Sequence, residues 1–144
     1  MKTKANPAKI PMNKQPIKAD LKNLKKLAGQ ISKTLRGGEV LALIGPLGSG
    51  KTTFTKFLGK ELKIKNPIAS PTFILMQSFP AKLKNGSPIE MYHLDLYRTK
   101  KFKEIKALGL TEIWQNKNHI TVIEWADKIK KYLPKNTLYL KFLN

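Results

Sequence analysis

Residues 45–52 have the residue types and the spacing of a phosphate-binding loop. They read GPLGSGKT, which fits the pattern G-x-x-x-x-G-K-[ST] at every defined position. The glycines let backbone N–H groups turn towards phosphate oxygens, where a Cβ atom would collide. We predict that Lys51 reaches the β- and γ-phosphates of a nucleotide and that the Thr52 hydroxyl binds Mg²⁺. The alternative is a glycine-rich turn with an incidental lysine, which is disfavoured because a predicted strand precedes the loop and a predicted helix follows it.

Two acidic residues stand at the ends of predicted strands, where a site for phosphoryl transfer needs carboxylates. Glu124 directly follows the apolar run 120–123, and the carboxyl ends of strands line the ligand crevice of an open α/β sheet. We therefore interpret Glu124 as an acid of the Walker B type, and Asp95 as a residue that joins the metal shell or orients a water molecule. The alternatives are a solvated glutamate at a strand end and a capping aspartate beside a packed Tyr97.

Four further residues could take part in such a site, and the sequence leaves their roles open. His93 is more typical of a packed or hydrogen-bonded strand residue than of a ligand, and His119 is expected in a loop. Trp125 could contact the nucleotide, contact a partner or simply pack. Arg98 could act as an arginine finger, although an arginine that pairs with Asp95 or faces solvent is the more common case.

The elements around the loop follow from hydrophobic spacing. Apolar residues recur at helical spacing between residues 21 and 35, with Asp20 as the expected N-cap and glycines at 37–38 as the stop. The run VLALI at 40–44 is typical of a parallel strand that is buried on both faces. Residues 52–62 are predicted to be helical.

The second half of the chain predicts a mixed sheet. Residues 73–79 and 89–96 are predicted strands, and the Asn85-Gly86 pair between them favours a tight turn and hence an antiparallel hairpin. Four further elements are predicted, namely a short helix over 102–108 that Gly109 ends, a buried strand over 120–123, a lysine-faced helix over 126–133 and a final strand over 137–142. The expected fold is α/β, a three-layer P-loop NTPase with a mixed central sheet.

The composition fits a single globular domain, because 144 residues suit one α/β domain and are too few for two. There is no cysteine, which excludes a disulfide framework and a cysteine-based metal site. No run approaches the roughly 20 apolar residues that span a bilayer, and no signal peptide is evident, so a cytoplasmic protein is expected. Residues 1–17 are predicted to form a basic, flexible arm, and residues 18–144 the P-loop domain.

The formal net charge of +19 is the most unusual bulk property. The first 36 residues hold ten Lys or Arg residues and one acid, Asp20. Such a field attracts nucleic acid. The alternative is that lysines merely cover solvated faces, and no aromatic residues are interleaved with the N-terminal charges as a base-stacking surface would require.

Four motifs, in order, resemble the signatures of one family. The phosphate loop, SPTF at 70–73, HLDLYR at 93–98 and IEW at 123–125 are similar to the ordered motifs of the TsaE (YjeE) family. The resemblance runs from about residue 20 to about residue 140, and the three motifs beyond the loop make it specific.

The resemblance implies an ATPase needed for threonylcarbamoyladenosine modification of tRNA. Its hydrolysis of ATP would support turnover of the threonylcarbamoyl-transferase TsaD and its partner TsaB, with Mg²⁺ as cofactor and tRNA as a candidate partner. By motif position, Thr52 and Glu124 would hold Mg²⁺, Asp95 would serve hydrolysis, and residues 70–72 would form a switch-like loop over the γ-phosphate. The implied nucleotide-binding set is Gly45, Leu47, Gly48, Ser49, Gly50, Lys51, Thr52 and Thr53.

Three departures from the family pattern bear on these roles. Pro46 stands where the family usually has Asp, which puts in doubt any contact made by that acid. Leu24 takes the place of a threonine common in the N-terminal helix. One predicted strand follows the last helix where many relatives have two, so a shorter sheet edge is expected.

Two other functions stay open. A small-molecule or nucleoside kinase shares the phosphate loop, yet such enzymes generally carry a lid with several arginines, and this chain has only Arg36 and Arg98. An RNA-binding accessory protein that only senses ATP is favoured by the net charge and disfavoured by Asp95 and Glu124. ATP turnover alone, with TsaD and TsaB, and with tRNA would separate the three.

Overall fold

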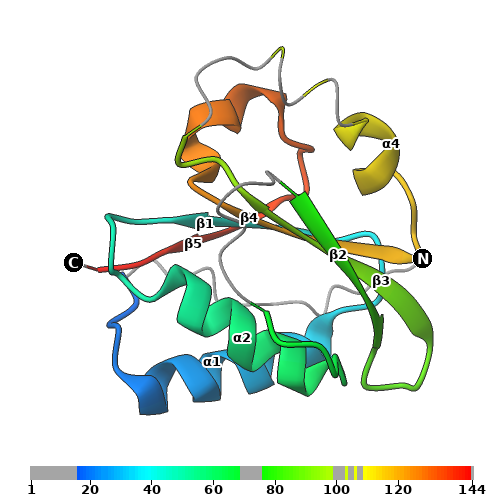
Figure 1. Ribbon diagram of the computed structural model, residues 1–144, viewed down its shortest axis with the longest axis horizontal. Coiled ribbons are helices and arrows are strands. Elements are labelled where there is room, and N and C mark those ends of the chain that lie inside the picture. The colour runs from blue at the N-terminus through cyan, green and yellow to red at the C-terminus, as the bar shows by residue number, and fades with distance from the viewer. Residues whose placement is uncertain (1–15, 69–75, 99–102, 104–105, 107–108, 144) are drawn as a thin grey trace, which may run out of the picture.

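The computed structural model describes residues 16–68, 76–98, 103, 106 and 109–143. They form a mixed sheet of five strands with helices on both faces, which confirms the three-layer α/β fold (Figure 1). The 70–72 loop and most of the helix predicted over 102–108 lie outside the described residues, as does most of the basic arm.

The sheet has the strand order β2-β3-β4-β1-β5. Its strands are β1 (Val40–Ile44), β2 (Met76–Lys82), β3 (Pro88–Asp95), β4 (His119–Glu124) and β5 (Leu138–Lys141). β1 pairs in parallel with β4 and β5, β3 pairs in parallel with β4, and β2 is antiparallel to β3. The carboxyl ends of β1, β3 and β4 therefore meet at one edge of the sheet, which is where α/β proteins build their ligand crevice.

A tight turn joins β2 to β3, as the Asn85-Gly86 pair predicts. Gly86 has a φ of +90°, and its N–H donates to the Leu83 carbonyl at 2.9 Å. The Leu83 N–H in turn donates to the Ser87 carbonyl at 2.9 Å. The antiparallel hairpin is confirmed, and it places β3 between β2 and the parallel strands.

Helices cover both faces of the sheet (Figure 1). One face carries α1 (Leu21–Thr34) and α2 (Lys51–Glu61), and the other carries the short helix α4 (Leu110–Trp114) and the 3₁₀ helix η1 (Ala126–Tyr132). The predicted N-cap of α1 is confirmed, because Asp20 Oδ1 accepts hydrogen bonds from the Lys22 and Asn23 N–H groups at 2.8 and 3.4 Å.

The core lies in two layers, one on each side of β1. Successive strand residues point to opposite faces, so Leu41 and Leu43 pack with the cluster under α1 and α2, whereas Val40 and Ala42 pack with the cluster under α4 and η1. These four side chains are at most 1% exposed, which confirms a strand buried on both faces.

Three local predictions need correction. The helix predicted over 126–133 is a 3₁₀ helix, Ala126–Tyr132. It is broken at Ile129, where φ is −126°, because burial of the Ile129 side chain in the core determines the local backbone conformation. The sequence missed α4, for which Gly109 is the left-handed N-cap (φ +74°). His119 was expected in a loop but begins β4, because pairing with Glu90 on β3 extends the strand beyond its apolar run.

Ile17 lies beside the end of β5. Its N–H donates to the Lys141 carbonyl at 2.8 Å, and the Leu143 N–H donates to the Ile17 carbonyl at 2.7 Å, which makes a parallel bridge between Ile17 and Phe142. The sheet edge that was expected to be short is thus extended by one residue from the N-terminal segment. None of the described helices is long and apolar enough to cross a membrane.

Candidate functional site

The phosphate loop turns between the end of β1 and the start of α2, as the sequence predicts. β1 ends at Ile44 and α2 begins at Lys51, with Gly50 as its N-cap. The Ser49 N–H donates to the Pro46 carbonyl at 3.1 Å, which closes the turn. The unpaired N–H groups and the positive end of the dipole of α2 therefore face the loop, as an anion requires.

Two glycines of the loop are required by space and by backbone conformation. A Cβ atom on Gly45 would lie 2.7 Å from Ser49 Oγ and 2.9 Å from the Phe142 backbone oxygen. Gly50 has a φ of +101°, and a Cβ atom there would lie 3.0 Å from Leu24 Cδ1. A side chain at Gly45 would collide with these neighbours, and one at Gly50 would in addition strain the backbone.

Lys51 folds back over the loop. Its Nζ donates to the Gly45 and Pro46 carbonyls at 2.6 and 2.9 Å, and it lies 4.2 Å from the centre of the Trp125 ring. Only 4% of the residue is exposed. Burial lowers the pKa of the ammonium from its ordinary value of 10.5, while nearby carboxylates, Glu124 first among them, act in the opposite direction.

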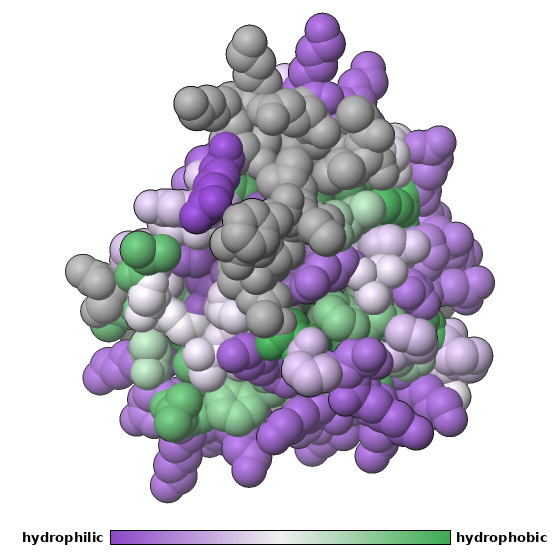
Figure 2. All heavy atoms as spheres, in the orientation of Figure 1, coloured by the Kyte–Doolittle hydropathy of each residue, from purple (hydrophilic) through white to green (hydrophobic). Residues whose placement is uncertain are grey.

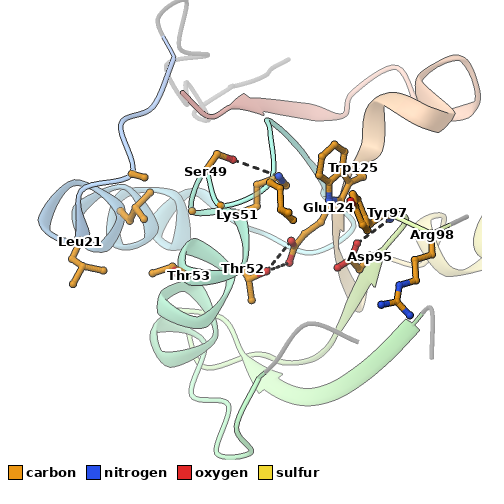
Figure 3. Close-up of a pocket in the computed structure, with 15 residues that line it drawn as sticks. Leu21, Ser49, Lys51, Thr52, Thr53, Asp95, Tyr97, Arg98, Glu124 and Trp125 are labelled. Carbon is orange, nitrogen blue, oxygen red and sulfur yellow. Dashed lines mark hydrogen bonds between the residues drawn. The ribbon is translucent and has the colours of Figure 1, made fainter. Parts of the chain in front are cut away.

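Thr52 and Glu124 meet at the mouth of the loop (Figure 3). The Thr52 hydroxyl lies 2.8 Å from Glu124 Oε1 and 2.9 Å from Oε2. Glu124 is 3% exposed, and its Oε2 also lies 2.7 Å from Nε2 of the buried His93. The hydroxyl and the carboxylate are hard oxygen donors of the kind that hold Mg²⁺ beside a nucleotide phosphate. The residues present therefore fit this ion.

Asp95 joins Glu124 at the same edge of the sheet. The two residues are partners in the β3–β4 register, and both line the cavity at the loop. Asp95 Oδ1 accepts a hydrogen bond from the Tyr97 N–H at 3.0 Å. The structure brings the two predicted acids together, so an adjacent pair of carboxylates faces the phosphate loop.

A cavity of about 510 Å³ opens in front of the loop (Figure 3). Lys51, Thr52, Asp95 and Glu124 supply polar lining, and Ala19, Leu21, Leu24 and Leu47 supply apolar lining. Leu21 and Asp95 lie at opposite ends of the view in Figure 3. Of the predicted nucleotide-binding set, all but Gly45 line the cavity directly, and the Gly45 carbonyl holds Lys51. A charged end and an apolar end suit a ligand with a phosphate tail and a flat organic base.

The sequence left several residues of this site undecided, and the structure places them. Trp125 lines the cavity in a left-handed conformation (φ +61°), with its ring 5.0 Å from that of Tyr97. Arg98 is exposed at the rim. His93 is hydrogen-bonded within its strand layer, as expected, but its partner Glu124 was not foreseen. Its position two residues before Asp95 was the available signal, since alternate strand residues share a face.

Comparison with known proteins decides the family. The family profile described as "Threonylcarbamoyl adenosine biosynthesis protein TsaE" matches residues 18–144. The chain belongs to the TsaE family. The motif resemblance is therefore confirmed over nearly the whole chain.

Relatives in the TsaE family come from distant bacteria. Proteins named "tRNA threonylcarbamoyladenosine biosynthesis protein TsaE" are 40% identical in Aquifex aeolicus, 38% in Nostoc sp. and 37% in Bacillus subtilis, over 73, 77 and 72% of this chain. The matched regions span 71, 67 and 60% of those proteins, respectively. The crystal structure of Bacillus subtilis YdiB is similar with a TM-score of 0.59 and 27% identity, covering 86% of this chain and 72% of that one.

The close packing around Gly45 predicts that a side chain there lowers the stability of the fold. Gly45→Ala should destabilise the fold by about 1–3 kcal/mol, because the new methyl group overlaps a backbone oxygen that cannot move aside alone. Gly29→Ala in α1 is the matched control, since its Cβ would lie 3.6 Å from the nearest atom, and it should stabilise by about 0.5–1 kcal/mol. Chemical denaturation measures both, and an equally stable Gly45→Ala would contradict the close packing.

Proposed function

We propose that this chain is the ATP-binding and ATP-hydrolysing component of the machinery for tRNA threonylcarbamoyladenosine biosynthesis. The observation that carries the proposal is the contact between Thr52 and Glu124 beside a complete phosphate loop, in a chain of the TsaE family. ATP and Mg²⁺ are the proposed cofactors. Hydrolysis would support turnover of the TsaD–TsaB complex, with tRNA as a candidate partner and the cytoplasm as the expected location.

The cavity supports ATP as the ligand. The N–H groups of the loop and of the first turn of α2 would bind the phosphates, and Lys51 would exchange its carbonyl partners for phosphate oxygens. The apolar end at Leu21, Leu24 and Leu47 would receive the adenine ring. Leu24, which replaces the threonine of the family pattern, lines the cavity at this apolar end.

The acids support hydrolysis in addition to binding. Thr52 and Glu124 would hold Mg²⁺, which neutralises charge on the phosphates when it is bound. Asp95, the register partner of Glu124, would accept a hydrogen bond from the water molecule that attacks the γ-phosphorus, with ADP as the leaving group. Among the described residues, the single arginine that lines the cavity is Arg98, so the site has few cations to stabilise the transition state by itself.

Removal of the Lys51 charge should impair nucleotide binding. Lys51→Ala is expected to weaken Mg²⁺–ATP binding by about 10- to 100-fold, because a hydrogen bond to a charged group contributes about 1.5–3 kcal/mol. Lys56→Ala, on the exposed side of the same helix, is the control and should bind as the parent does. Calorimetric titration decides the matter, and unchanged affinity in Lys51→Ala would refute the assignment of the phosphate loop.

The two acids should matter for turnover more than for affinity. Glu124→Gln and Asp95→Asn are expected to lower kcat by at least about 100-fold while ATP affinity changes less than about tenfold, since contacts made in the transition state appear in turnover. Glu112→Gln, an exposed acid on α4, should have no effect on either quantity. Equal losses in binding and in turnover would assign both acids a structural role.

Turnover should depend on partners. Because Arg98 is the single arginine among the described residues that line the cavity, we expect slow ATP hydrolysis by the isolated chain and faster hydrolysis with TsaD and TsaB. The stimulation should weaken at high salt, because the Debye length falls from about 10 Å at 0.1 M to about 3 Å at 1 M.

Steady-state assays of the chain alone, with TsaD and TsaB, and with tRNA provide the test. Full activity of the isolated chain together with a phosphorylated small acceptor would instead indicate a kinase. Stimulation by tRNA in the absence of TsaD and TsaB would indicate an RNA-binding accessory protein.

A further inference from the structure

His93 is the most deeply buried titratable residue at the site. It is 0% exposed and lies on β3, two residues before Asp95. Its partner Glu124 is 3% exposed. Burial of a carboxylate is costly unless hydrogen bonds satisfy its oxygens. The contact between the two side chains therefore affects the orientation of the Glu124 carboxylate and which of its oxygens is available to another ligand.

The contact fixes which ring nitrogen carries the proton. Nε2 lies 2.7 Å from Glu124 Oε2, and a carboxylate can only accept, so Nε2 must be the donor. Nδ1 is buried and has no hydrogen-bond partner among the described residues. A proton on Nδ1 would be a buried donor without an acceptor, which costs more than an unused lone pair. The geometry therefore places the proton that faces Glu124 on Nε2.

The two oxygens of Glu124 are held differently. Oε2 contacts both His93 Nε2 at 2.7 Å and the Thr52 hydroxyl at 2.9 Å, whereas the hydrogen-bond partner of Oε1 among the described residues is the Thr52 hydroxyl, at 2.8 Å. The Thr52 hydroxyl carries one proton, so it can donate to only one of the two Glu124 oxygens at a time, while its lone pairs stay available to a metal ion. His93 holds Oε2 in either case, so Oε1 would be the oxygen that turns to the ion.

We propose that His93 is a positioning residue, whose Nε2–H holds Oε2 of Glu124 so that Oε1 would be available to bind Mg²⁺ beside Thr52. The inference rests on the proposed function, because it assigns His93 a role at the same site. Outer-shell partners of this kind orient metal ligands, and their loss typically costs 10- to 100-fold in metal affinity or activity. A histidine that only filled the core would have no such effect.

The protonated nitrogen can be observed without nucleotide or metal. A long-range ¹H–¹⁵N spectrum of the nucleotide-free protein should show a single, fixed His93 tautomer with the proton on Nε2. His119, whose Nδ1 lies 3.0 Å from the Ile113 carbonyl, provides an internal comparison as a histidine that should carry its proton on Nδ1. A proton on Nδ1 of His93, or an average of two tautomers, would overturn the proposal.

Substitutions test the effect on Mg²⁺. Binding of a non-hydrolysable ATP analogue is measured against Mg²⁺ concentration in folded protein, as verified by thermal melting. His93→Leu should raise the half-saturating Mg²⁺ concentration by about 10- to 100-fold. His93→Gln, which keeps an N–H donor of similar reach, should stay within about threefold of the parent. An unchanged Mg²⁺ requirement in His93→Leu, or equal impairment in both variants, would contradict the positioning role.

Two controls isolate the His93–Glu124 contact. His119→Leu, at the opposite end of β4, should leave the Mg²⁺ requirement unchanged. In a Glu124→Gln background, His93→Leu should raise the half-saturating Mg²⁺ concentration little further, since Glu124→Gln has already altered the contact that His93→Leu removes. A parent protein that does not bind the analogue would refute the proposed function, and the tautomer spectrum would still decide whether Nε2 is the donor. If His93→Leu does not fold, that spectrum and His93→Gln decide the proposal.

Discussion

The buried carboxylate of Glu124 constrains the whole arrangement around the phosphate loop. A charge in this position is tolerated only with hydrogen bonds to satisfy it, and these come from Thr52 on α2 and from His93 on β3. The backbone at Glu124 is hydrogen-bonded as well. The Glu124 carbonyl accepts from the Leu96 N–H, and the Trp125 N–H donates to the Leu43 carbonyl, both at 3.1 Å. The geometry of the site therefore depends on the pairing of β1, β3 and β4.

Lys51 is a buried cation, whose ammonium needs acceptors just as the Glu124 carboxylate needs donors. Its hydrogen bonds, to two backbone carbonyls and to Ser49 Oγ at 3.4 Å, are all to oxygen atoms, which are the acceptors that a buried ammonium needs. The Trp125 ring shields the ammonium from the side. Trp125 adopts a left-handed backbone conformation that costs a bulky residue about 1–2 kcal/mol, and strain of this kind is concentrated at functional sites.

The sequence predicts local features of this chain better than contacts between distant residues. Hydrophobic period and loop chemistry suffice for β1, α1 and the Asn85-Gly86 hairpin, because each is determined by neighbours in the chain. The phosphate loop is predictable for the same reason. Both acids could be placed at strand ends, but their pairing depends on the register of β3 against β4, which no local pattern specifies.

The features that were missed depend on tertiary packing. The contact of His93 with Glu124 spans 31 residues of sequence. α4 is only five residues long, and its start is set by the conformation of Gly109 rather than by a polar cap. The apolar end of the cavity combines Ala19 and the start of α1 with the phosphate loop, so it exists only once α1 packs against α2.

Acidic residues are scarce in this chain, and most of those described have a specific role in the fold or the site. The chain has nine acids against 28 Lys or Arg residues. Asp20 caps α1, Glu39 accepts the Arg36 and Gly37 N–H groups at 2.9 and 2.7 Å, and Glu61 pairs with Lys84. Asp95 and Glu124 are at the cavity. Few acids are left to neutralise the surface lysines, so a positive field extends into solvent and would attract a polyanion to the molecule. Hydrophilic residues cover most of the described surface on the face that Figure 2 shows. The two carboxylates at the cavity make the positive field locally weaker there than over the lysine-covered faces.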